Sequence, residues 1–147
     1  MLKTLGIIAL ILVCTATGFY LSMRLRKRKE RLAAFYELIG KISDGIRIGQ
    51  SLPEIFSREG KTLGITFEND KTHFPADYLY AEDKHLLGDF FSELGLSDTS
   101  SQINRCSAYQ SLLKKHLHSA EKDALEKGSL YGKLGFFAGL FISVLVV

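Results

Sequence analysis

The sequence lacks the short motifs from which several common catalytic sites are built. It has no glycine-rich phosphate loop ending in Lys and Ser or Thr, no Gly-x-Ser-x-Gly turn and no His-Glu-x-x-His pair. Its neighbouring carboxylates, Glu82 with Asp83 and Asp123 with Glu126, fit solvated helix faces better than acid–base partners. We therefore predict that the chain is not an enzyme and holds no cofactor.

Metal ligands and cysteines are equally scarce. Two histidine ligands on one helix face need a spacing of three or four residues, whereas His116 and His118 point about 200° apart. Cys106 lies ten residues from His116, which does not align them either. Cys14 lies in an apolar segment away from Cys106, so no disulfide framework is expected. We predict no metal site and interpret the histidines as solvated or packed side chains: His73, His85, His116 and His118.

Charge is absent from residues 4–23, and Lys133 is the only charged residue within residues 128–147. A helix rises about 1.5 Å per residue, so twenty uncharged residues span the ~30 Å hydrocarbon core of a bilayer. We predict a transmembrane helix over residues 1–23. A cleaved signal peptide is the alternative, because Ala16-Thr17-Gly18 offers small residues, but the basic residues that follow are typical of a stop-transfer flank.

The second apolar segment, residues 130–147, is predicted to cross the membrane as well. Lys133 can extend to the headgroups, and Tyr131 suits the membrane interface. The alternative is a buried core helix, which the apolar residues on every face of the segment disfavour. Gly135 and Gly139 form a Gly-xxx-Gly pair, which allows two membrane helices to approach closely.

The charged residues are divided unevenly between a membrane edge and the region beyond it. Six basic residues against Glu30 give residues 24–31 a net charge of +5, while residues 32–129 have a net charge of −4. Excess Lys and Arg stays cytoplasmic, so we predict a cell-membrane protein whose termini lie outside and whose central domain is cytoplasmic. An acidic domain argues against nucleic-acid binding. The residues that set this topology can also contact lipid headgroups: Arg24, Arg26, Lys27, Arg28, Lys29 and Arg31.

Between the spans, residues 32–129 are predicted to form a helical bundle, which makes the chain an all-α protein with a transmembrane helix at each end. Apolar residues recur there at three- and four-residue steps, and Ser97 or Asp98 can cap a last helix that continues without proline into the second span. A strand at residues 62–67 would have no partner, so residues 61–77 are interpreted as a connection. The expected soluble helices begin near Leu32, Ser51, Tyr80 and Asp98. Ser51 can cap the second of these, Pro53 suits its first turn, and it is expected to end near Gly60.

Several stretches occur in a characteristic order along the chain. They are Met1-Leu2-Lys3, Gly18-Phe19-Tyr20-Leu21, Ile42-Ser43-Asp44-Gly45, Ser51-Leu52-Pro53-Glu54-Ile55, Leu94-Gly95-Leu96-Ser97-Asp98 and Tyr131-Gly132-Lys133-Leu134-Gly135-Phe136. With the two-anchor layout, they resemble the stage III sporulation protein AB family of endospore-forming bacteria. That family usually has a longer helical stretch in the middle, where this chain has only residues 56–90.

The resemblance implies a membrane component of the channel complex that links mother cell and forespore, with its domain on the mother-cell side. The family's soluble domain is similar to the cytoplasmic domain of the type II secretion platform protein F, against which a separate ATPase docks. The partners implied are membrane lipid, other membrane proteins of the sporulation channel complex and its cytoplasmic ATPase, with further copies of the chain as an option. The alternatives are a membrane adaptor or assembly factor unrelated to sporulation, and a membrane enzyme completed by another chain.

The candidate partner-binding surface is the turn that precedes the last helix. It comprises Gly95, Leu96, Ser97 and Asp98, with Arg105 close by in the sequence. An ordinary helix-capping turn is the simpler interpretation of the same residues. Thiol labelling of Cys106 from each side of the membrane is expected to show on which side the domain lies.

Replacing the six basic residues of residues 24–31 with Gln tests the predicted topology. The substitution removes the Lys and Arg excess, so we expect weaker or inverted membrane insertion. Protease accessibility from each side of sealed vesicles measures the orientation, with the unaltered chain as control. An unchanged orientation would show that another feature of the chain sets the topology.

Overall fold

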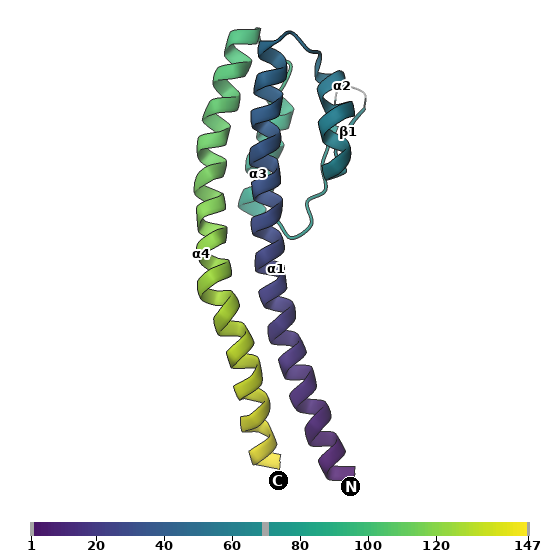
Figure 1. The fold of residues 1–147 in the computed structure, drawn as a ribbon, viewed down its shortest axis with the longest axis vertical. Coiled ribbons are helices and arrows are strands. Elements are labelled where there is room, and N and C mark those ends of the chain that lie inside the picture. The colour runs from purple at the N-terminus through teal and green to yellow at the C-terminus, as the bar shows by residue number, and fades with distance from the viewer. Residues whose placement is uncertain (1, 69–70, 147) are drawn as a thin grey trace. The chain divides into compact units, whose positions relative to one another are not determined.

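The computed structural model describes residues 2–68 and 71–146, and 83% of the chain is helical. The prediction of an all-α protein is confirmed (Figure 1). The elements in chain order are α1 (Leu2–Arg47), α2 (Leu52–Ile55), a π-helical turn η1 (Phe56–Gly60), a 3₁₀ turn η2 (Lys61–Leu63), β1 (Thr66–Glu68), β2 (Lys71–His73), α3 (Ala81–Glu93) and α4 (Thr99–Val146).

The chain forms two compact units, and α1 and α4 contribute to both. The first unit comprises residues 1–29 and 119–147, and the second comprises residues 30–118. By length and composition, α1 and α4 are each apolar enough to cross a membrane. Their apolar segments expose large side chains: Phe19 is 68% exposed and Phe141 75%. Such exposure suits side chains that face lipid.

In the first unit, the two apolar segments pack through glycine. A Cβ placed on Gly135 would lie 2.7 Å from the backbone oxygen of Cys14, and one on Gly139 would lie 3.1 Å from the Cα of Ile11. Gly18 in turn faces the backbone of Tyr131 and Gly135. Residues further along α4 contact residues earlier in α1, so the two segments are antiparallel (Figure 1). The helix that packs against Gly135 and Gly139 is therefore α1 of the same chain.

The core of the second unit is built from one face of α1, from α3 and from the first part of α4, with Ile55 and Phe56 added from α2 and η1. The three- and four-residue periodicity predicted a buried face on α1, and Leu32, Phe35 and Ile42 are completely buried. Phe91 of α3 makes aromatic contacts with Phe35, at a centroid distance of 6.4 Å, and with other rings of this core. Each buried aromatic removes a large apolar area from water, and edge-to-face pairs add further stability.

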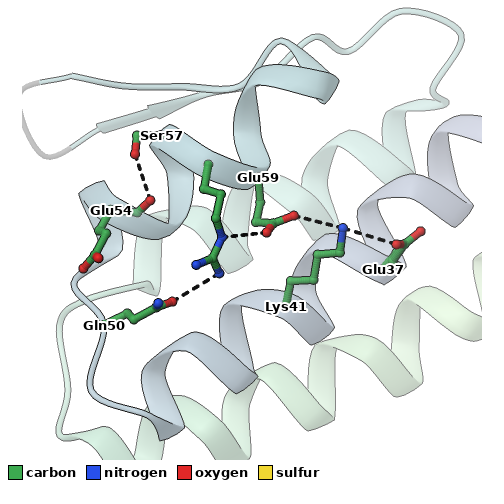
Figure 2. Close-up of polar contacts among 7 residues, drawn as sticks. Glu37, Lys41, Gln50, Glu54, Ser57 and Glu59 are labelled. Carbon is green, nitrogen blue, oxygen red and sulfur yellow. Dashed lines mark hydrogen bonds and ion pairs between the residues drawn. The ribbon is translucent and has the colours of Figure 1, made fainter.

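A chain of charged groups joins η1 to α1 on the surface of the second unit (Figure 2). Lys41 Nζ of α1 lies 3.3 Å from a carboxylate oxygen of Glu37 and 2.9 Å from one of Glu59. Arg58 donates to Glu59 at 2.8 Å and to Gln50 at 3.2 Å. These contacts raise the pKa of Lys41 and lower the pKa of Glu59, so both groups stay charged near neutral pH.

Residues 61–77 were predicted to be a connection with at most a short helix or turn. The turn η2 agrees with this, but the region also contains a short β-hairpin, so the expected absence of a strand is wrong. β1 and β2 are antiparallel, with Phe67 opposite Thr72. The partner that the 62–67 segment was expected to lack is the adjacent segment, Lys71–His73. Phe67 stacks on Phe56 of η1 at a centroid distance of 5.5 Å, and this contact holds the two-stranded sheet against the helices.

The short helix expected from Ser51 to near Gly60 is present as α2 followed by η1. Pro53 lies in its first turn, as its fixed φ and missing N–H favour. Ser51 takes the N-cap position, but its side chain makes no capping hydrogen bond to any described residue, so that part of the prediction is wrong.

Gly135→Ala tests the close packing of the two apolar segments. The added Cβ would overlap the Cys14 carbonyl, so we expect a loss of about 1–3 kcal/mol of stability and a lower melting temperature. Thermal unfolding of the full chain in detergent measures the effect. Gly132→Ala is the matched control, because nothing lies within 4 Å of its Cβ position and alanine favours helix. Equal responses of the two variants would contradict the packing.

Candidate docking surface

The turn between α3 and α4 is shaped by one glycine and two side-chain bonds. Gly95 has φ +87°, a left-handed conformation that only glycine adopts readily, and it ends α3. Asp98 then caps α4, because its Oδ2 accepts a hydrogen bond from the backbone N–H of Ser101 at 3.1 Å. Gln102 Nε2 donates to the carbonyl of Ser97 at 2.6 Å. These bonds hold Leu96 outward, and its side chain is 78% exposed.

The two charged members of the predicted surface behave differently. The hydrogen bonds from Ser101 lower the pKa of Asp98, so its carboxylate is ionised at neutral pH. The contribution of this cap to stability is therefore lost only as the pH falls through the lowered pKa. The charge of Arg105 is less available to a partner protein, because its guanidinium lies 3.3 Å from the carboxylate of Glu93 on α3.

A groove of about 570 Å³ opens beside this turn, and it was not predicted from the sequence. Gly95 and Leu96 form one wall together with Leu94, while Ile46, Leu52 and Phe67 contribute from α1, α2 and β1. These residues are separated by up to fifty positions in the sequence, so no local pattern could reveal that they meet. The close approach is tight, since a Cβ on Gly95 would lie 3.1 Å from Leu52 Cδ1.

The structure therefore brings part of the predicted surface together. Gly95 and Leu96 line the groove, and Asp98 follows them at its edge. Ser97 is half-buried and its carbonyl is bonded within the turn, so it shapes the surface. Arg105 lines a smaller hollow with Tyr109 and Glu93 instead.

The side chains of the basic flank differ in how far they are exposed. In the first unit, Arg28 is only 4% exposed and lies 3.5 Å from Asp123, while Lys29 lies 3.6 Å from Glu121. Arg24 and Arg26 are exposed. Lys29 is also exposed, whereas Lys27 and Arg31 are half-buried. Asp123, interpreted as part of a solvated acidic pair, instead bridges Arg28 and Lys127.

Cys106 is a poor probe of sidedness, contrary to the expectation from the sequence. Its side chain is completely buried, and burial raises the pKa of the thiol from 9.0 to about 11. The thiolate, which is the reactive species, is therefore roughly 100-fold scarcer at neutral pH than the ordinary pKa would allow. A cysteine introduced at the exposed Leu96 would report the location of the domain directly.

Asp83 is the clearest departure from the sequence analysis, which placed it on a solvated face. It is completely buried. Its Oδ1 lies 2.7 Å from Nδ1 of His116 on α4, and its Oδ2 accepts the backbone N–H of Tyr80 at 3.0 Å. The carboxylate thus caps α3 and joins it to α4. The sequence around Asp83 cannot reveal this role, because the partner histidine lies 33 residues away along the chain.

A metal-binding role does not arise from these side chains. Within residues 2–68 and 71–146, no group of three or more His, Cys, Asp or Glu side chains is arranged to hold a metal ion. His85, the histidine nearest to Asp83 in the sequence, pairs with Asp89 at 2.8 Å on the same helix, and its side chain is 79% exposed.

Residues 57–147 match the family model described as stage III sporulation protein AB. The matched segment begins in η1 and contains α3, the turn at Gly95 and all of α4. It includes two of the stretches on which the resemblance was based, near Leu94 and Tyr131, and leaves the stretches before residue 57 outside. No curated protein and no solved structure matches the chain.

Asp83→Ala tests the buried link between α3 and α4. The substitution leaves His116 and the Tyr80 N–H without their acceptor, so we expect a loss of about 1–3 kcal/mol and a melting temperature lower by several degrees. Thermal unfolding of the full chain in detergent measures it. His85→Ala is the control, since it removes an exposed pair worth less than about 1 kcal/mol. A similar melting temperature for both variants would contradict the assigned role of Asp83.

Proposed function

The chain belongs to the stage III sporulation protein AB family, and we propose that it is a non-catalytic platform component of the channel complex between mother cell and forespore. Membership of the family gives the chain a role in sporulation and favours that role over an adaptor unrelated to sporulation. The family is a structural one in sporulation and is not known as an enzyme family. A platform function needs anchoring and a docking surface rather than catalysis.

The observation that carries this proposal is the extent of the family match. It includes the second apolar segment, which supplies an anchor, and the exposed turn at Gly95 to Asp98, which offers a contact surface. The first apolar segment packs against the second through Gly18, Gly135 and Gly139. An anchor of two antiparallel helices resists rotation and tilt better than a single helix, because backbone contacts fix their relative orientation.

We place the second unit in the cytoplasm of the mother cell, with both termini on the other side of the membrane. The exposed Arg24 and Arg26 support this placement, because Lys and Arg beside a span stay on the cytoplasmic side. Antiparallel packing of the apolar segments also supports it, since two antiparallel spans return the chain to the side from which it started. Anionic headgroups are the natural lipid partners of the two exposed arginines.

The proposed partner on the cytoplasmic side is the ATPase of the same complex. The proposal follows the analogy with the type II secretion platform protein F, whose cytoplasmic domain receives a separate ATPase. The turn at Gly95–Asp98 supports it, because Leu96 is exposed and Asp98 is ionised, which suits a surface that contacts another protein. Other membrane proteins of the complex would contact the lipid-facing sides of α1 and α4.

Charge reversal tests the docking surface. We expect Asp98→Lys with Arg105→Glu to reduce recovery of the ATPase with this chain from membranes by about tenfold or more, a change of ~1.4 kcal/mol. The matched control is Asp77→Lys with Lys114→Glu, which also preserves net charge and alters two exposed residues outside the turn. Melting temperatures verify that both double variants fold. Unchanged recovery with the first pair would remove the docking role from this turn.

A further inference from the structure

The groove beside the α3–α4 turn is lined by uncharged side chains, in a chain that is rich in charge. Charged residues make up 24% of the chain, yet none of the side chains that line the groove is ionisable. The apolar walls come from Ile46, Leu52, Phe67, Leu94 and Leu96. An uncharged hollow of about 570 Å³ is large enough to receive a side chain, and five apolar side chains are available to contact it.

The polar side chains at the groove are already engaged within the chain. Gln102 donates to the carbonyl of Ser97 at 2.6 Å, and the amide oxygen of Gln50 accepts from Arg58 at 3.2 Å. The groove therefore offers a partner apolar side chains set among polar groups, two of which are already bonded within the chain. Leu96 extends this surface outward at the rim, where it is 78% exposed.

The charged groups next to the groove are unequal in sign. Glu54 adjoins the lining residue Pro53, Asp98 adjoins Thr99, and both are exposed. No ion pair with another described residue involves either carboxylate, whereas the nearby bases Arg58 and Arg105 are paired with Glu59 and Glu93. Glu68, which adjoins Phe67, is a third exposed carboxylate, and Arg47, which adjoins Ile46, is an exposed base, so the rim is acidic by two charges.

We propose that this groove receives an apolar side chain from a segment of the docking ATPase that carries basic residues next to that side chain. The inference rests on the proposed function and specifies the contact by which docking occurs. The apolar anchor would be buried against Leu52, Phe67 and Leu96, and the basic residues would pair with Glu54 and Asp98. Such an arrangement, with a buried anchor inside a charged rim, concentrates binding energy at the anchor.

The test measures binding of the purified ATPase to the full chain in detergent or nanodiscs. Leu96→Glu places a charge at the apolar rim, and we expect affinity to fall about tenfold or more. Because Leu96 is exposed, the variant keeps the fold. Leu112→Glu is the matched control, since Leu112 is a 43%-exposed leucine of α4 that does not line the groove. Its affinity should equal that of the unaltered chain.

The electrostatic half of the proposal is tested with Glu54→Gln and Asp98→Asn together. Asparagine retains the cap of α4 while removing the charge. We expect affinity to fall several-fold and to become less sensitive to salt. Absence of ATPase binding to the unaltered chain would overturn the proposed function and this inference together. Normal binding that responds equally to Leu96→Glu and Leu112→Glu, or that ignores the two neutralised carboxylates, would overturn this inference alone.

Discussion

Backbone-to-backbone contact between two apolar helices is the constraint from which the rest of the molecule follows. Gly135 meets the carbonyl of Cys14, and Gly139 meets Ile11, at distances that leave no room for a larger side chain. Lipid provides no hydrophobic force between helices, so their association depends on such close packing. Both α1 and α4 continue from the first unit into the second.

Two kinds of interaction stabilise the second unit: burial of apolar side chains and one buried polar contact. Phe35 and Phe91 anchor an aromatic core between α1 and α3. The carboxylate of Asp83 caps α3 and meets His116 of α4, so it joins two helices that a purely apolar contact would leave free to slide. On the outer side, Lys41 and Glu59 hold η1 against α1 with an exposed ion pair that contributes much less.

The proposed docking surface depends on this scaffold rather than on the turn alone. Gly95 and the Asp98 cap give the turn its shape, and both belong to α3 and α4. The groove exists only because Phe67, held by stacking on Phe56, and Leu52 are brought to the same place. A family of structural proteins in sporulation is expected to place its specificity in such an assembled surface, since no single segment carries a catalytic motif.

The sequence by itself determined the two apolar segments, the helical periodicity of residues 32–46 and the glycine stop and aspartate cap around residues 95–98. Each of these is a local or periodic property, and the physical rules for spans, amphipathic faces and caps operate on near neighbours in the chain. Tertiary structure alone decided that Asp83 is buried, that Arg28 pairs with Asp123, that Cys106 is inaccessible and that residues 66–73 form a hairpin seated on Phe56. The first three outcomes depend on contacts between residues that are far apart in the sequence. The hairpin depends on a surface against which two three-residue strands can pack.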